Sequence, residues 1–228
     1  MYKYLKLLRT KHWLKNILLF AAPFFGGRLL SGETLLMAFP AFMAFSLSAS
    51  VAYIFNDIRD VENDRLHPEK RKRPIASGDI SQGKALIFAA VLCTVAIFMS
   101  YKIAVPFLYF ILAYLSIQAA YSVYLKNIPI VDIFCIASGF IIRVLAGGAA
   151  FKVEVSQWLL LTMFMISLVL ATGKRLGEVS LLNEKAGKHR KSLGYYSTAN
   201  LNEILLISSS ASLIAYALYT VEQFQDLV

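Results

Sequence analysis

The sequence predicts an all-α membrane protein, a polytopic helical bundle, and three observations support this fold class. Of the 228 residues, 58% are hydrophobic and only 16% are charged, which excludes an ordinary soluble domain. The mean hydropathy is +0.61. The charged residues gather in short blocks between apolar segments, and such segments cross the roughly 30 Å hydrocarbon core of a bilayer as helices.

About seven segments are apolar over a length that can span a bilayer. In chain order they lie near 14–30, 37–56, 84–100, 104–123, 131–150, 156–173 and 203–221. No soluble segment, low-complexity linker or repeat separates them. We therefore expect one transmembrane domain covering 1–228, with its polar chemistry in loops, at helix ends or between helices.

Lysine and arginine predict the orientation, because positively charged short loops stay in the cytoplasm. Nineteen of the 23 lie in residues 1–15, 59–84, 126 and 174–191, whereas three lie on the opposite side and one lies within a span. The N-terminus is therefore expected in the cytoplasm, and an odd number of spans leaves the C-terminus outside. The first span follows a basic segment without a small-residue cleavage site, which favours a retained helix over a signal peptide.

An acidic stretch, Asn56 to Asp64, follows the second predicted span. If the helix that begins near Met37 continues through it, 100° per residue places Asp57, Asp60 and Asp64 on one face, with Asn56 beside Asp60. Like charges at this spacing repel unless a cation lies between them. Oxygen ligands without nearby His or Cys favour Mg²⁺, or Mn²⁺. The alternative is a solvated acidic helix end.

Two basic clusters lie in the predicted cytoplasmic loops. Four consecutive cations, 70–73, stand between Pro68 and Pro74, and from them Lys70, Arg71 and Arg73 are candidate phosphate ligands. The second cluster follows the sixth span, where Lys174 and Arg175 are candidates for a polyanion and Glu178 is expected to pair with Lys174. The alternative is that both clusters only set topology and meet anionic lipid headgroups.

Two ionisable residues lie in or near the fifth predicted span. We expect Asp132 at the membrane interface, and Arg143 either paired or facing a polar cavity, because a charge within a span is costly. Gly139, Gly147 and Gly148 suit close helix packing. Lys15, Asn16 and Lys126 are weaker candidates for substrate binding. The two cysteines and three histidines lack metal-ligand spacing.

The stretch from Asn56 to Asp64 resembles the N-D-x-x-D-x-x-x-D motif of the UbiA superfamily of intramembrane prenyltransferases. Members normally carry a second aspartate-rich motif after the sixth span, but residues 174–202 contain no Asp. This departure is similar to the branch formed by the decaprenyl-phosphate phosphoribosyltransferases. The similar stretches are 9–16, 56–78, 173–178 and 190–193.

The resemblance implies a Mg²⁺-dependent transferase that moves a 5-phosphoribosyl group from phosphoribosyl pyrophosphate to a polyprenyl phosphate, for cell-envelope precursor synthesis. It implies a cell-membrane protein with a cytoplasmic active site and no nucleic-acid partner. Catalysis and metal binding would fall to Asp57, Asp60 and Asp64, with Asn56 as a further ligand. Substrate binding would fall to Lys15, Asn16, Asn56, Lys70, Arg71, Arg73, Lys126, Arg143, Lys174 and Arg175.

Two alternatives stay open from the sequence. A UbiA-type enzyme could instead transfer a polyprenyl group from its diphosphate to an aromatic or other acceptor, with Glu178 or Glu184 replacing the second motif. The charges could otherwise belong to a non-catalytic transporter or lipid-binding scaffold. The superfamily usually has about nine helices, so we expect this chain to be either C-terminally truncated or a short member.

Overall fold

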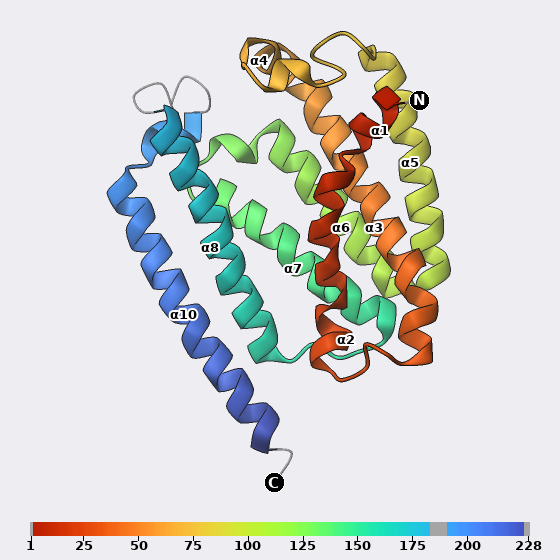
Figure 1. Ribbon diagram of the computed structural model, residues 1–228, viewed down its shortest axis with the longest axis vertical. Helices are drawn as coiled ribbons and strands as arrows, with labels where there is room; N and C mark the ends of the chain where they lie inside the picture. The colour runs from red at the N-terminus through yellow and green to blue at the C-terminus, as the bar shows by residue number, and fades with distance from the viewer. Residues whose placement is uncertain (1, 183–190, 226–228) are drawn as a thin grey trace. The chain divides into compact units, whose positions relative to one another are not determined.

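The computed structural model describes residues 2–182 and 191–225, and helices are the regular secondary structure of that part of the chain (Figure 1). Within these two ranges, six helices are long and apolar enough to cross a membrane. They are α3 (Gly32–Arg59), α5 (Gln82–Ile103), α6 (Val105–Val123), α7 (Val131–Phe151), α8 (Gln157–Leu182) and α10 (Thr198–Gln225). Each overlaps a predicted span, so the predicted all-α membrane bundle is confirmed.

The remaining helices are short. They are α1 (Tyr2–Leu8), α2 (Ala21–Phe25) and α4 (Val61–Leu66), with the 3-10 helices η1 (Thr10–Phe20), η2 (Lys70–Lys72), η3 (Leu125–Asn127) and η5 (Lys191–Tyr195). The first predicted span, 14–30, corresponds to η1 and α2, which together extend about 30 Å because a 3-10 helix rises about 2.0 Å per residue. This segment is not a regular α-helix and is not among the six candidate membrane helices of the described residues, so its crossing of the membrane stays a prediction.

The chain forms two compact units, which we call unit 1 (residues 1–123 and 143–154) and unit 2 (residues 124–142 and 155–228). The division falls within α7 at Arg143, so this helix contributes its first half to unit 2 and its second half to unit 1.

In unit 1, α3 packs against α5, α6 and η1, and Figure 1 shows α3 and α5 side by side. Close approach is possible because the buried positions of α3 are mostly small: Ala41, Ala44, Ser46, Ser48, Ala49, Ser50 and Ala52. Such residues let membrane helices approach closely, and their hydroxyls supply hydrogen bonds where no water is available.

Two serines, one helical turn apart on α3, hold η1. Asn16 Nδ2 donates to Ser46 Oγ at 2.9 Å, and Trp13 Nε1 donates to Ser50 Oγ at 3.1 Å. On the α7 side, a Cβ added to Gly147 would lie 1.8 Å from the carbonyl oxygen of Leu19. Only glycine fits there, which confirms the packing role expected for Gly147.

The loop that follows α4 folds back onto a core shared with α1. This cluster consists of Leu7, Ile54, Val61, Ile75, Ile80, Ala85 and Ala89. Because α1, the end of α3 and the loop share one apolar core, Arg9 after α1 and Arg73 before Pro74 are both held at the same end of α3.

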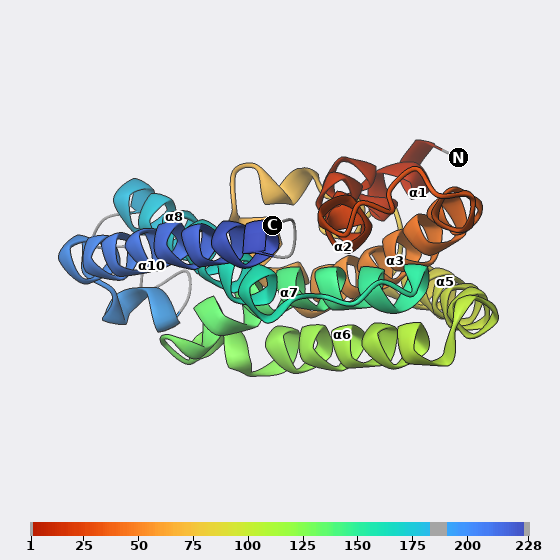
Figure 2. The ribbon, with the colours of Figure 1, turned by 90° about the horizontal axis from the view of Figure 1, so that it is seen from below.

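Unit 2 is built on the pair α8 and α10, which lie side by side in both ribbon views (Figures 1 and 2). Their common core with the first half of α7 consists of Ile133, Ala137, Leu168, Ala171 and Leu201.

Candidate active site

The acidic stretch lies where α3 ends. The predicted face of aspartates assumed a helix that continues through Asp64, but α3 ends at Arg59 and α4 begins at Val61, with Asp60 between them at φ −98° and ψ 9°. The interruption is a single residue. Backbone N–H groups still donate four residues back, from Asp60 to Asn56 at 2.9 Å and from Asp64 to Asp60 at 2.8 Å. The helical register of α3 therefore continues almost unchanged into α4.

Asp57 and Asp64 are both buried and share one guanidinium. Arg73 Nη1 lies 3.1 Å from Asp57 Oδ1 and 2.5 Å from Asp64 Oδ2. Arg9 forms a second ion pair with Asp57 through Nη2 and Oδ1. The arginine side chains keep 17% and 24% exposure, whereas the two carboxylates keep 3% and 4%. Each cation therefore faces the carboxylates on one side and open space on the other.

The pair Asp57 and Asp64 suits a divalent cation by its donor chemistry. Within the described ranges, no three Asp, Glu, His or Cys side chains are grouped as a metal cage. Mg²⁺ does not require one, because it usually binds one or two carboxylates and takes its other ligands from water and substrate phosphate. Two buried carboxylates that converge on one cationic nitrogen fit that requirement.

The other two predicted ligands have different surroundings. Asn56 Oδ1 accepts a hydrogen bond of 3.3 Å from Ser122 Oγ on α6. Asp60 is half-buried at the junction between α3 and α4. The structure therefore brings Asp57 and Asp64 together, and the four-residue ligand set stays a prediction.

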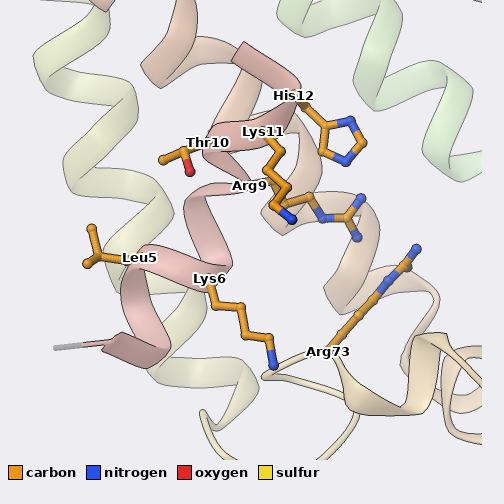
Figure 3. A pocket seen from close by; sticks show the side chains of 7 residues that line it. All are labelled: Leu5, Lys6, Arg9, Thr10, Lys11, His12 and Arg73. Carbon is orange, nitrogen blue, oxygen red and sulfur yellow. The ribbon is translucent and has the colours of Figure 1, made fainter. Parts of the chain in front are cut away.

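A basic cavity of about 560 Å³ opens beside this pair (Figure 3). Its lining comes from the segment around the break between α1 and η1, together with Arg73. The residues are Leu5, Lys6, Arg9, Thr10, Lys11, His12 and Arg73. Arg9 and Arg73 therefore belong both to the cavity wall and to the carboxylate network.

The predicted substrate ligands of unit 1 are divided by this geometry. Arg73 joins the carboxylate network, whereas Lys70 and Arg71 lie on η2, half-buried and exposed respectively. Lys15 is exposed on η1. For Lys15, Lys70 and Arg71, substrate binding stays a prediction.

Arg143 pairs as expected for a charge within a span. Its Nε donates to Asn16 Oδ1 at 2.8 Å, and its guanidinium lies 5.1 and 5.0 Å from the rings of Phe45 and Tyr114. Asn16 is fully buried. Arg143 and Asn16 thus face each other in the core of unit 1, and a substrate role for either stays a prediction.

In unit 2, Arg175 is fully buried and engaged by two carboxylates. Its Nε lies 2.6 Å from Asp132 Oδ2, and its Nη1 donates to Glu178. Asp132 lies in the first turn of α7 and its side chain has 0% exposure, so it is buried within unit 2, and its position at the membrane interface stays a prediction. The sequence placed Glu178 with Lys174, one turn away, but could not show that Arg175 points inward.

A tyrosine completes this network. Tyr196 Oη donates to Asp132 Oδ1 and accepts the N–H of Ile130 at 2.6 Å. Burial and the hydrogen bond to Asp132 raise the pKa of Tyr196. Ile130 has a positive φ of 67°, which is rare for a β-branched residue, and the hydroxyl of Tyr196 holds that backbone in place.

The remaining substrate-binding candidates are Lys126 on η3 and the second basic cluster, which begins on α8. Lys174 is exposed on α8, and the backbone oxygen of Lys126 accepts a 2.9 Å hydrogen bond from Ser192 Oγ. Glu184 and the basic residues 188–190 lie outside the described residues. Substrate binding by Lys126, Lys174 and Arg175 stays a prediction.

Of the seven residues that line the cavity, the sequence predicted only Arg73 and missed the other six: Leu5, Lys6, Arg9, Thr10, Lys11 and His12. Stretch 9–16 carried part of the family resemblance, but only Lys15 and Asn16 were taken from it. The clustering of cations directly before the first span was the available signal. Charge that sets topology produces the same signal, so composition could not single these residues out.

A family model identifies the class of protein to which this fold and its acidic site belong. The model of the UbiA prenyltransferase family matches residues 17–220, and the chain belongs to this family of integral membrane proteins. The resemblance found in the acidic motif is thereby confirmed.

The relatives of this chain include several enzymes of one name. It is 40% identical over 220 residues to the decaprenyl-phosphate phosphoribosyltransferase of Corynebacterium glutamicum, covering 94% of this chain and 66% of that protein. It is 37% identical over 222 residues to the enzyme of the same name from Mycobacterium tuberculosis, covering 96% and 74%. The chain thus spans two thirds to three quarters of these relatives.

Solved structures share the fold. A UbiA homolog from Archaeoglobus fulgidus bound to GPP and Mg²⁺ superposes with a TM-score of 0.81 at 21% identity, covering 94% of this chain and 76% of that one. The same homolog was also solved with Cd²⁺. A digeranylgeranylglyceryl phosphate synthase superposes with a TM-score of 0.75 at 19% identity, covering 97% and 78%.

Proposed function

We propose that this protein transfers a 5-phosphoribosyl group from phosphoribosyl pyrophosphate to a polyprenyl phosphate at the cytoplasmic face of the cell membrane. The observation that carries the proposal is the contact of Asp57 with Arg9 and Arg73, which joins a carboxylate pair to a basic cavity. A donor with a pyrophosphate and a separate phosphate needs both environments. The names of the relatives support this donor and acceptor.

In this reaction the bond between the anomeric carbon and the pyrophosphate oxygen breaks, and pyrophosphate leaves with the electron pair. An oxygen of the lipid phosphate then forms the new bond to that carbon. Asp57 and Asp64, with Asn56 and Asp60 as further candidates, would hold Mg²⁺. When bound, the cation would neutralise negative charge on the leaving pyrophosphate.

The chain's own groups do the remaining work. Arg9 and Arg73 balance donor charge from the open side of the carboxylates, where charge-assisted bonds to phosphate are strong. The acceptor phosphate is already an anion, so no general base is needed. The product, a phosphoribosyl lipid, suits cell-envelope precursor synthesis.

The test uses purified protein in lipid nanodiscs with labelled phosphoribosyl pyrophosphate, a polyprenyl phosphate and Mg²⁺. We expect label in the lipid fraction with stoichiometric pyrophosphate release. Asp64→Asn should lose about 10²-fold or more in turnover, as removal of a charge-stabilising group does. The matched control is Asp79→Asn, which removes an exposed carboxylate from the loop between η2 and α5. This variant should keep the wild-type turnover. Mn²⁺ in place of Mg²⁺ tests the metal preference.

The second candidate is prenyl transfer, favoured by the family and by fold neighbours solved with GPP or DMAPP. The two candidates differ in the donor consumed. Supplying a labelled prenyl diphosphate with an aromatic acceptor separates them. Turnover of that donor without any phosphoribosyl lipid would overturn the proposal.

A further inference from the structure

The break between α1 and η1 gathers cations that a continuous helix would disperse. Lys6 and Lys11 are five residues apart, so an α-helix would separate them by about 140° around its axis. Arg9 lies between them in the left-handed region, at φ 52° and ψ 48°. Because the chain changes direction there, Lys6, Arg9 and Lys11 line one cavity (Figure 3).

The unusual backbone of Arg9 is held from several sides. Its guanidinium pairs with Asp57 and lies 5.1 Å from the ring centroid of Tyr53. The preceding carbonyl, that of Leu8, accepts a 2.8 Å hydrogen bond from Ser50 Oγ. A non-glycine residue in this region is a local strain that the surrounding structure must maintain, and such strain clusters at ligand sites.

The role of basic residues in setting membrane orientation does not by itself explain this arrangement. A cation that only directs membrane insertion can stay in water, as Lys72 does at 63% side-chain exposure beside Glu69. Arg9 and Arg73 are instead largely covered and oriented by a buried carboxylate. Their positions are fixed toward the cavity, which favours a ligand over a diffuse surface charge.

The charge and size of the cavity indicate the ligand. Four permanent cations line it, namely Lys6, Arg9, Lys11 and Arg73, and two carboxylates touch them, Asp57 and Asp64. Before a divalent cation binds, two positive charges remain, which matches a phosphate monoester at about −1.5 to −2. The volume of about 560 Å³ falls within the roughly 300–1,000 Å³ of small-molecule sites, so it accommodates more than a lone ion.

We propose that this cavity binds a phosphate monoester, contributed either by the 5-phosphate of the sugar donor or by the headgroup of the lipid acceptor. Arg9 and Arg73 bind it from the carboxylate side, and Lys6, Lys11 and the Thr10 hydroxyl bind it from the mouth. The proposal rests on the proposed function for the identity of these two sources. It assigns the phosphate contact to the segment before the first span, beside Arg73, and not to η2.

The experiment measures binding, so it does not depend on transfer. Ribose 5-phosphate and dodecyl phosphate serve as unreactive probes of the two sources, titrated calorimetrically into full-chain protein in neutral-lipid nanodiscs. The variants Lys6→Gln and Lys11→Gln remove exposed cations without touching the Asp57 network. Lys72→Gln removes the same charge outside the cavity and is the matched control.

We expect each cavity variant to weaken one probe about tenfold, as loss of a charged hydrogen bond does, while Lys72→Gln leaves it within twofold. Weakened ribose 5-phosphate binding assigns the cavity to the donor, and weakened dodecyl phosphate binding assigns it to the acceptor. Equal affinities in Lys6→Gln, Lys11→Gln and wild type for both probes, or no binding to wild type, would overturn the proposal. A failure of phosphoribosyl transfer alone would instead count against the proposed function.

Discussion

The two units both place arginine against buried carboxylate, yet the arrangements differ in one respect. In unit 1, Arg9 and Arg73 keep 17% and 24% of their side chains exposed and line a cavity. In unit 2, Arg175 keeps 0% and is enclosed between Asp132 and Glu178. An enclosed pair cannot exchange partners without local opening, whereas a half-open one can accept a ligand on its free side. We therefore interpret the unit 1 network as a site and the unit 2 network as a support.

Arg175→Gln should give the largest effect on folding. It leaves Asp132 buried without its guanidinium partner, which costs about 3–5 kcal/mol when one side of a buried ion pair is removed. Thermal denaturation of the purified variant in detergent measures this loss. Arg73→Gln, the matched change in unit 1, should lose less than half as much. A stable Arg175→Gln protein that no longer binds donor would reverse the comparison and favour Arg175 as a substrate ligand.

Asp57→Asn should give the largest effect on activity in a protein that remains folded. Turnover should fall about 10²–10³-fold, since the amide keeps the shape but loses the charge. Asp132→Asn is the counterpart in unit 2, and its activity per folded molecule should stay within a few-fold of wild type. The assay is phosphoribosyl-lipid formation normalised to folded protein. Equal losses in both variants would remove the distinction between site and support.

Tyr196→Phe should destabilise unit 2 by about 1–3 kcal/mol, because a buried carboxylate and a backbone N–H each lose a hydrogen-bond partner. The neighbouring Tyr195 is 75% exposed, so Tyr195→Phe is a control expected within about 0.5 kcal/mol of wild type. Melting curves of the two variants, recorded side by side, test the difference. Identical curves would mean that Tyr196 does not hold the backbone at Ile130.

The smallest effect should come from Asp79, whose carboxylate accepts a 2.6 Å hydrogen bond from Lys3 at the surface. Hydrogen bonds from Lys3 and Ser77 lower the pKa of Asp79. Because the pKa is lower in the folded state, the ionised carboxylate stabilises the protein at pH values above the usual Asp pKa of about 3.9. This stabilisation is lost as the pH falls through the lowered pKa. The melting difference between wild type and Asp79→Asn should be small at neutral pH and vanish in acid. A difference that grows in acid would contradict this sign.

The hydropathy pattern predicted much of the fold. The six long helices of the described part of the chain all overlap predicted spans, because a run of apolar residues has one stable state in a bilayer. The first predicted span, 14–30, contains η1 and α2 instead of a long α-helix, so its conformation was not predicted. The 3-10 form of η1 depends on Ser46, Ser50 and Gly147, which lie on other helices.

The site was predicted in part. The spacing predicted that Asp57 and Asp64 face the same side, and both contact Arg73 although Asp64 lies on α4, because the single interrupting residue Asp60 keeps the i to i+4 bonding. Arg73 was predicted as a phosphate ligand from the run of four cations in its loop. Arg9 was missed, since its left-handed backbone and its ion pair with a residue 48 positions away leave no local signal.

By itself, the sequence determined the membrane class, the helical spans, the acidic motif and the excess of cations, because burial of apolar length and the repulsion of like charges are local properties. Only the tertiary structure decided which cations meet the carboxylates and how open each pair is. The reason is physical: exposure depends on packing between distant segments. The shared core of Leu7, Ile54 and Ile75 leaves the side chains of Arg9 and Arg73 17% and 24% exposed, whereas in unit 2 the side chain of Arg175 is 0% exposed.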